Sequence, residues 1–575
     1  MSNTFSRRGW LALAAGATAG LAADPANGAT ANGAGSPAAL AAGHGGGDAA
    51  AGHGTAAPAP DLGPIRGAGA SDNALGARLY NIRDFGAKGD GTSLDTKALQ
   101  AAIDACTRDL GGTVLVPAGR FVIGTVELKS NVTLHLAAQA TLVGSADGTQ
   151  YRAAEAIPLS GDTTLNDGNV GLIFAVGADN ITIEGKGTID GQGAQFRSPA
   201  RGLPSPAGRT GNDRPYHLLF HKCNNLTVRD IYLYKCAYHS IRVIQSEHIK
   251  MGGLRIYSKV IHNNDGFHFI SCRYVHLSNC DVQCQDDACA LFGSCQYITV
   301  TNCSFSTRWS VFRFGGGEAR NITVSNCLIY EAYGCPIKMR GGQGSRFEDI
   351  RFSDIVMRDV TGPISIGLQG EGVVRNISFS GIHATVVKPV QLREAEFTSG
   401  YRPGEVFSCM VLNGVGEAYL ENISFEDVHV HYPGGGTEEQ AAVRAVPAIA
   451  REYFEIGVPP AYGLYVRNVK GLTLSNIRLT VDNPELRPAL IMDHVTDAAV
   501  NGLSAQGDEN VESLIRIIDS SDVLLTATRV LSKVPVFLRL EGPACANIKV
   551  DGGDQTKATK LTAFEAGALV QPVQQ

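Results

Sequence analysis

A short motif of alternating apolar residues recurs along most of this chain. Examples are Asn225-Leu-Thr-Val228, Tyr274-Val-His-Leu277, Asn321-Ile-Thr-Val324 and Asn376-Ile-Ser-Phe379, and in the middle of the chain successive copies lie 23 to 28 residues apart. Apolar residues at every second position indicate a β-strand, and a strand that returns at a nearly fixed period indicates a solenoid. The repeat therefore constrains the fold more than any other feature of the sequence.

The segments between these motifs lack the 10- to 15-residue helical patterns that βαβ units require. We therefore expect an all-β fold, a single-stranded parallel β-helix over residues 78–560, in which each turn pairs with the next. A coil of this kind exposes apolar core at its ends. A capped amphipathic helix is predicted to cover the N-terminal end, because Asp95-Thr96 precedes apolar residues at helical spacing: Ala98, Leu99, Ala102, Ile103 and Cys106.

The two ends of the chain are expected to lie outside the coil. Residues 1–23 combine paired arginines with a short apolar run, which is typical of a twin-arginine export signal, an ordinary secretory signal being the alternative. Residues 24–77 are rich in Ala, Gly and Pro, as in a disordered linker, and residues 561–575 are expected to form a tail. We expect a bacterial protein in the periplasm or outside the cell, without a membrane span.

Composition excludes some functions. The net charge is -6 and charged residues make up 18% of the chain, so nothing indicates a basic surface for nucleic acid. Three of the 13 cysteines, Cys280, Cys303 and Cys327, each follow an Asn at intervals of 23 to 24 residues. This period predicts buried ladders of thiols and of Asn279, Asn302 and Asn326 rather than disulfides, and no paired C-x-x-C spacing indicates zinc. We expect a monomer that needs no metal or cofactor.

Three aspartates fall inside the most regular part of the repeat. Asp265 lies 21 residues before Asp286, which is followed by Asp287, and this spacing is close to one turn of the coil. Carboxylates on successive turns would share one patch of surface, as acid/base cleavage of a glycosidic bond requires. An Asp in a turn also commonly binds local backbone, so a structural role is the alternative.

Several segments resemble glycoside hydrolase family 28, the polygalacturonases and rhamnogalacturonan hydrolases. They are Asn81 to Thr92 (NIRDFGAKGDGT), Gly187 to Gly193 (GTIDGQG), Arg214-Pro215, and above all Asn263-Asn-Asp265 with Asp286-Asp287. The resemblance implies a right-handed parallel β-helix and an inverting mechanism. It also implies that Asp286 is the general acid and that Asp265 and Asp287 activate the attacking water.

The chain departs from this family at three places. The region of the family's Gly-His-Gly contains no histidine, and counting one turn from Asp287 leads to Arg308. The family's Arg-Ile-Lys is replaced by Pro336-Ile-Lys338, with Arg340 close behind, and Gln285 replaces the glycine before the paired aspartates. His239 and His268 have no evident nucleophile to pair with, so we expect them to be structural.

These departures bear on the substrate. Lys338, two turns from the acid, would lie about 10 Å away, a suitable distance for binding the carboxylate of a neighbouring uronic acid. Arginine adds planar, bidentate contacts to such a group. We therefore expect an acidic, galacturonate-containing polysaccharide or oligosaccharide to be bound by Asn263, Arg308, Arg313, Lys338 and Arg340, although the arginines could also be solvated or stacked on Trp309.

Two other functions agree with the same residues. A β-helix polysaccharide lyase could use the carboxylates to hold Ca²⁺ while an Arg or Lys removes the proton next to a uronate carboxyl group. A glycan-binding β-helix could retain the groove and cut nothing, since one fold serves several functions.

Overall fold

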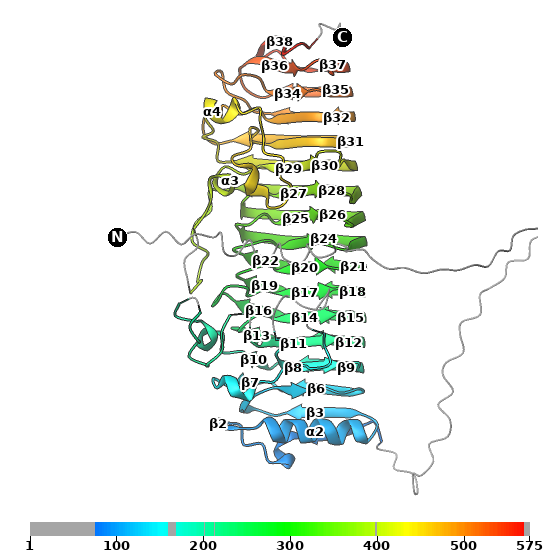
Figure 1. The fold of residues 1–575 in the computed structure, drawn as a ribbon, viewed down its shortest axis with the longest axis vertical. Coiled ribbons are helices and arrows are strands. Elements are labelled where there is room, and N and C mark those ends of the chain that lie inside the picture. The colour runs from blue at the N-terminus through cyan, green and yellow to red at the C-terminus, as the bar shows by residue number, and fades with distance from the viewer. Residues whose placement is uncertain (1–74, 159–167, 201, 212, 397–399, 569–575) are drawn as a thin grey trace, which may run out of the picture. The chain divides into compact units, whose positions relative to one another are not determined.

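The computed structural model describes residues 75–158, 168–200, 202–211, 213–396 and 400–568. They belong to one compact unit that begins at Ala74 and is a parallel β-helix, as predicted (Figure 1). The expected export signal and almost all of the expected linker lie outside the described residues. No described helix is long and apolar enough to cross a membrane.

Three parallel sheets run along the coil, each built from one strand or part of a strand per turn. The first sheet consists of β5 (Val126–Glu127), β8 (Gly171–Val176), β11 (Tyr216–His221), β14 (Ile241–Ile244), β17 (Phe267–Ile270), β20 (Cys289–Phe292), β23 (Phe312–Gly315), β25 (Ile337–Gly341), β27 (Ile364–Gln369), β29 (Met410–Val415), the first parts of β31 (Leu464–Val481) and β32 (Leu490–Asn501), β34 (Ile515–Ile518), β36 (Val534–Glu541) and β38 (Ala558–Glu565).

The second sheet consists of β1 (Arg78–Asn81), β3 (Gly112–Val116), β6 (Val132–Leu136), β9 (Asp179–Gly185), β12 (Asn224–Arg229), β15 (Glu247–Gly252), β18 (Arg273–Ser278), β21 (Cys295–Thr301), the first halves of β24 (Glu318–Ala332), β26 (Arg346–Val360), β28 (Val373–Val386) and β30 (Leu420–Tyr432), later parts of β31 and β32, β35 (Ser521–Val530) and β37 (Ala546–Asp554).

The third sheet consists of β2 (Asp90–Leu94), β4 (Gly119–Ile123), β7 (Ala140–Gly144), β10 (Thr188–Asp190), β13 (Tyr232–Tyr234), β16 (Arg255–Ser258), β19 (Asp281–Cys284), β22 (Ser304–Thr307), the second halves of β24, β26, β28 and β30, the end of β31, β33 (Ser504–Ala505) and the end of β35.

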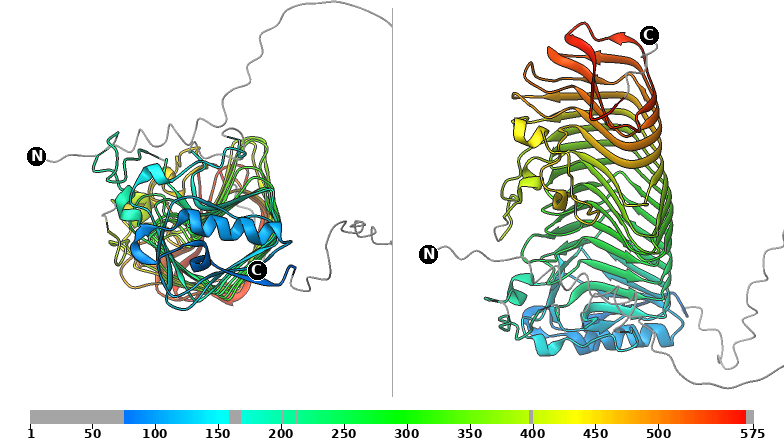
Figure 2. Two further views of the ribbon diagram at one scale, coloured as in Figure 1. Left: turned by 90° about the horizontal axis from the view of Figure 1, so that it is seen from below. Right: turned by 45° about the horizontal axis from the view of Figure 1, so that its top comes forward.

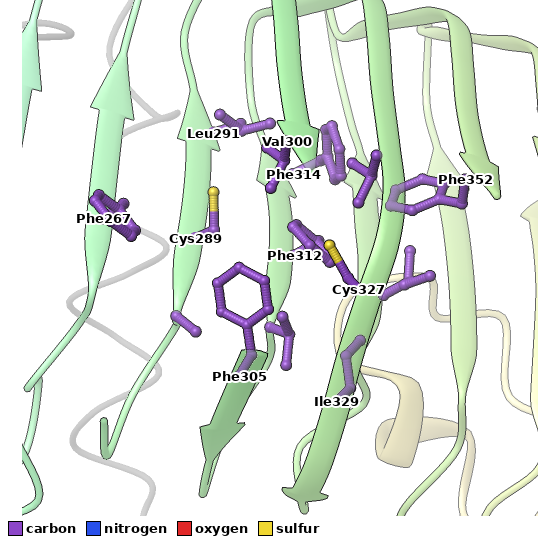
Figure 3. Close-up of a cluster of buried hydrophobic side chains, with 14 of the residues drawn as sticks. Phe267, Cys289, Leu291, Val300, Phe305, Phe312, Phe314, Cys327, Ile329 and Phe352 are labelled. Carbon is purple, nitrogen blue, oxygen red and sulfur yellow. The ribbon is translucent and has the colours of Figure 1, made fainter. Parts of the chain in front are cut away.

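Alternation within each strand separates the core from the surface. In the first sheet Phe267, Cys289 and Phe312 are register partners on neighbouring turns, and all three are buried in the apolar core (Figure 3). Residues between them, such as His268 in β17 and Arg313 in β23, face the other side of the sheet, because successive side chains of a strand point in opposite directions. The functional residues therefore lie on the outer face of the first sheet.

The Asn-Cys pairs lie at bends of the coil. Cys280, Cys303 and Cys327 are buried and form no disulfide, as predicted. The prediction of buried Asn partners is wrong, because Asn279, Asn302 and Asn326 are exposed and have φ angles of 55°, 55° and 52°. Asn adopts this left-handed conformation more readily than other side chains, so these residues serve the bend and not the core.

The helix α2 (Thr96–Arg108) lies across the N-terminal end of the coil, as expected (Figure 2, left). Its apolar stripe, which includes Leu99 and Ile103, is buried in the core. The predicted cap differs from the structure: the Asp95 carboxylate accepts hydrogen bonds from the backbone N–H groups of Lys88 (2.8 Å) and Gly89 (3.0 Å), not from the helix. Asp95 therefore fixes the preceding loop.

Two long insertions lie beside the coil. One, between β28 and β29, contains α3 (Pro403–Val406), and the other, between β30 and β31, contains α4 (Glu438–Ala441) and a 3-10 helix, η5 (Tyr453–Ile456). Both insertions lie to the left of the stacked strands in Figure 1. At the C-terminal end, β38 runs to Glu565, so the coil continues past residue 560, where the sequence suggested the start of a tail.

Candidate active site

The three aspartates lie where the chain turns from the third sheet into the first. Asp265 comes two residues before β17, and Asp286 and Asp287 lie between β19 and β20. Phe267 pairs with Cys289, and the N–H of Gly266 donates to the carbonyl of Asp287 at 3.0 Å, so Asp265 lies opposite Asp287. The turn is thus 22 residues long here, and the interpretation of the 21-residue spacing between Asp265 and Asp286 as one turn is wrong by one position.

Asn264 fixes the loop that carries Asp265. Its side chain is completely buried, and Oδ1 accepts hydrogen bonds from the N–H groups of Val260 (3.1 Å) and Ile261 (2.9 Å). Nδ2 donates to the carbonyls of Cys236 (2.8 Å) and Tyr238 (2.9 Å) on the preceding turn. A buried amide with four partners holds one conformation, because each broken bond would leave a polar group unsatisfied.

Burial raises the pKa of all three carboxyl groups, and the raised values follow from their neighbours. Burial and then the charge of Asp287 raise the pKa of Asp286 to about 7. Burial followed by the charges of Asp286 and Asp287 raises the pKa of Asp265 well above its usual value. Asp287 is also raised by burial, against the opposing charges of Lys338 and Arg313. Such a group can retain a proton near neutral pH.

Asp286 is held by short contacts on two sides. Its Oδ1 accepts the N–H of Asp287 at 3.0 Å, and Nδ2 of Asn263 donates to Oδ2 at 3.4 Å. Asn263 is oriented in turn by Nη2 of Arg214, which donates to its Oδ1 at 3.1 Å. Asn263, predicted as a substrate contact, therefore lies beside the acid, and Arg214 fixes its position.

His239 and His268 lie against Asp265, contrary to the expectation that they have no reactive partner. Nδ1 of His268 is 3.3 Å from Oδ2 of Asp265, and Nε2 of His239 is 3.6 Å from Oδ1. The two rings stack with centroids 4.8 Å apart, and their Nδ1 atoms are separated by 2.9 Å. Burial lowers the pKa of both imidazoles well below the usual value, so both are neutral near pH 7.

The same three side chains could in principle hold a metal, since their ligand atoms lie within 4.8 Å of one another. Two imidazoles and a carboxylate are ligands that a divalent transition metal accepts. However, the positive charge of Arg242 lowers the pKa of both histidines, and Arg214 and Arg242 act on Asp265. Fixed cations around the cluster oppose a divalent cation, and the cluster is better suited to positioning Asp265.

Arg308 does not lie one turn beyond Asp287. Phe312 pairs with Cys289, and the N–H of Ser310 donates to Oδ1 of Asp287 at 3.3 Å, so Ser310 has that position. Arg308 is buried and its Nη2 is 3.1 Å from Oε1 of Glu405 in α3, which is completely buried. The Arg308 guanidinium also lies 4.2 Å from the ring centroid of Tyr401. These contacts attach the first insertion to the coil.

Lys338 and Arg340 also bind a carboxylate of the chain itself. Nζ of Lys338 is 3.1 Å from Oε2 of Glu452, and Nη1 of Arg340 is 2.5 Å from Oε1 of the same side chain. Lys338 is only 1% exposed, and its Nζ lies 4.4 Å from the ring centroid of Trp309. Burial raises the pKa of Glu452, but Lys338, Arg340 and Arg313 outweigh it and bring the value to about 2.

Arg313 differs from the other predicted cations. It lies between Ala290 of β20 and Lys338 of β25 in the register of the first sheet, directly beyond the turn that carries Asp287. Within the described residues it forms no ion pair, and one guanidinium N–H is donated to the carbonyl of Phe314. Burial, with Arg340 as the second cause, lowers its pKa to about 10.

The motifs could not reveal Glu405 and Glu452. Both carboxylates come from insertions that have no repeat, and they lie 97 and 114 residues beyond Arg308 and Lys338. Charge alone gives no signal, since the chain contains 55 acidic residues. The histidine pair could have been found, because His239 and His268 lie on consecutive turns beside the first aspartate.

A parallel β-helix that gathers three carboxyl groups of raised pKa at one corner defines a class, the β-helix proteins with an acid/base site. The family model of the glycosyl hydrolases family 28 matches residues 106–450, more than half of the chain. The chain therefore belongs to this family, whose fold is the right-handed parallel β-helix.

Relatives with known names agree with this family. A probable polygalacturonase from Vitis vinifera is 26% identical over 324 residues, which cover 54% of this chain and 62% of the relative. An exo-poly-alpha-D-galacturonosidase from Dickeya chrysanthemi is 40% identical over 134 residues, 22% of this chain and 21% of the relative. The matches thus span less than two thirds of each relative. The family 28 exopolygalacturonase structure from Yersinia enterocolitica has 18% identity and a TM-score of 0.52, covers 74% of this chain and 78% of that one, and shares the fold.

Proposed function

We propose that the protein hydrolyses glycosidic bonds of a pectic, galacturonate-containing polysaccharide or oligosaccharide with inversion at the anomeric carbon. The observation that supports this most is the placement of Asp265, Asp286 and Asp287 at one corner of the coil, in a chain of family 28. Each has a raised pKa, and an acid/base pair needs carboxyl groups whose protonation differs at the working pH.

Asp286 is the general acid of the proposed reaction. With a pKa of about 7 it holds a proton that it donates to the leaving glycosidic oxygen as the carbon–oxygen bond breaks. A water molecule attacks the anomeric carbon from the opposite face and gives its proton to a carboxylate. Asp287 and Asp265 supply this base: Lys338 and Arg313 favour ionised Asp287, while His268 contacts Asp265.

The lyase alternative is weaker on two counts. A lyase would need a neutral Lys or Arg as base, but Lys338 is bound to Glu452 as an ion pair. A Ca²⁺ site needs ionised carboxylates, whereas burial favours the protonated forms of all three aspartates. Family membership likewise favours hydrolysis.

The test is to incubate the protein with homogalacturonan and with rhamnogalacturonan, with and without chelator. Hydrolysis would produce new reducing ends without unsaturated uronide absorbance, and NMR of the first product would show the inverted anomer. Asp286→Asn should remove the activity and keep the fold. Unsaturated products, or an active Asp286→Asn protein, would overturn the proposal.

We also propose that the protein is exported and works as a monomer. Residues 1–23 would act as the export signal, residues 24–77 as a linker, and the protein would reach the periplasm or the medium. Cell fractionation with Arg7→Lys and Arg8→Lys substitutions, and light scattering on the purified protein, test these two statements. Retention of the full-length protein in the cytoplasm of unmodified cells would contradict export.

A further inference from the structure

Glu452 places a negative charge where the sequence predicted a substrate carboxylate. It lies just before η5 in the second insertion, and its two oxygens are bound by Lys338 and Arg340 from β25. These two cations are two positions apart in one strand and point to the same side, so together they form a single carboxylate site. A side chain of the protein occupies that site.

The surroundings make this occupation permanent under working conditions. Glu452 is 9% exposed, and the pKa of about 2 keeps it ionised at any pH at which the aspartates could work. The backbone N–H of Glu452 donates to Oε2 of Glu455 at 3.3 Å, which fixes the start of η5. Trp309 further encloses Lys338, and Phe454 of η5 contacts that ring at 6.1 Å between centroids.

A second carboxylate could not be added here without large cost. Two carboxylates a few ångströms apart in a partly buried site repel each other strongly, because little water screens them. A uronate would have to displace Glu452 and leave it unpaired and buried. Arg308 offers no alternative, since Glu405 occupies it in the same way. Arg313 is the cation of this group that has no carboxylate partner among the described residues.

We propose that Glu452 is a specificity-determining residue: it fills the carboxylate site of Lys338 and Arg340, so the sugar bound there is uncharged, while Arg313 binds the carboxylate of one uronate. The inference rests on the proposed hydrolase function and narrows its substrate. The preferred chain has a galacturonate beside a residue without a free carboxylate. Methyl-esterified galacturonate and a neutral sugar share this chemistry.

The test compares Glu452→Gln with the unchanged sequence, both in an Asp286→Asn background, so that binding is measured without turnover. Three probes are used in calorimetric titrations: trigalacturonate, its methyl ester, and a rhamnogalacturonan oligosaccharide of equal length. Glu541→Gln is the matched control, because Glu541 is also a buried carboxylate bound by two cations, Arg444 and Arg516, in β36 far along the coil.

The expected result has two parts. The parent protein should bind at least one of the two partly or wholly uncharged probes more tightly than trigalacturonate, and whichever is tighter identifies the neutral partner. Glu452→Gln should bind trigalacturonate about tenfold more tightly, the gain of a charge-assisted contact to the released cations. Glu541→Gln should change neither preference.

Two outcomes contradict different statements. If the parent protein binds the probes and Glu452→Gln leaves the order of affinities unchanged, Glu452 does not set specificity. If the parent protein binds none of the probes, the proposed function itself fails. Should Glu452→Gln fail to fold, as judged by circular dichroism, Glu452→Asp serves instead: its shorter side chain loosens the contact with Lys338 and Arg340, and a smaller shift in the same direction is expected.

Discussion

Asp286 combines partial exposure with a pKa of about 7, and this single value sets the expected pH dependence of the protein. A general acid must carry its proton into the reaction, so kcat should fall as the pH rises through about 7. Replacement by Asn should lower kcat by about 10²- to 10⁴-fold at every pH. Measured kcat values between pH 4 and 9 check both statements.

The matched control for this prediction is Asp281→Asn. Asp281 is an exposed carboxylate five residues earlier in the same turn, on β19, and it lies away from the cluster. It should leave the pH profile unchanged. An alkaline limit that persists in an active Asp286→Asn protein would assign the proton to another group.

Individual residues also show where sequence reasoning ends. The repeat and the family motif were enough to place the three aspartates together, because both depend on local spacing. The partners of Arg308, Lys338 and Arg340 depend on where two irregular insertions fold back, which no period describes. The cations were therefore identified correctly as members of the site region, but their carboxylate partners were not.

At the scale of elements, the loop that precedes β17 depends on Asn264. Asn264→Ala removes four buried hydrogen bonds and leaves their backbone partners unpaired, so we expect a loss of about 3 kcal/mol in the free energy of unfolding. Because Asp265 follows directly, kcat should fall as well. Urea unfolding followed by circular dichroism, together with initial rates, measures the two effects.

Asn279→Ala is the comparison for Asn264→Ala. Asn279 is exposed at a left-handed bend, and its replacement should cost about 1 kcal/mol through the bend alone, with no change in kcat. Equal effects of the two substitutions would show that Asn264 has no special role in holding the site.

Elements with a period were predictable, and elements without one were not. The strands and α2 follow from apolar spacing, which decides which face of each element is buried. The length of the turn at the site, 22 residues between register partners, required the structure, because a shift of one residue in an unpaired corner leaves the strand pattern unchanged. That shift moved the position opposite Asp287 from Arg308 to Ser310.

On the scale of the whole molecule, the core contains thiols without disulfides. All 13 cysteines are buried, and none is paired. A thiol reagent such as DTNB should therefore react with almost none of them in the native protein and with all 13 after denaturation, and reducing agents should leave the Tm unchanged. A native protein that loses stability in dithiothreitol would contradict the assignment.

The carboxyl cluster should also make the stability of the coil depend on pH. Asp286 has a pKa of about 7 when folded against about 4 in the unfolded chain, so the folded state holds the proton more tightly. The stabilisation by this proton is complete below about pH 4 and is lost as the pH rises through 7. Between pH 5 and 8 the Tm should therefore fall by a few degrees more in the parent protein than in Asp286→Asn. Parallel curves would show that Asp286 is not perturbed.

The attachment of Glu452 through an insertion has a consequence for how such proteins diversify. The aspartates belong to the coil, where a change of length would disturb every later turn, whereas Glu452 belongs to a segment that adds no turn. Evolution can lengthen, shorten or recharge this segment without altering the catalytic geometry. Related chains with equal aspartates and different insertions are thus expected to divide between charged and uncharged sugars according to the residue that meets Lys338.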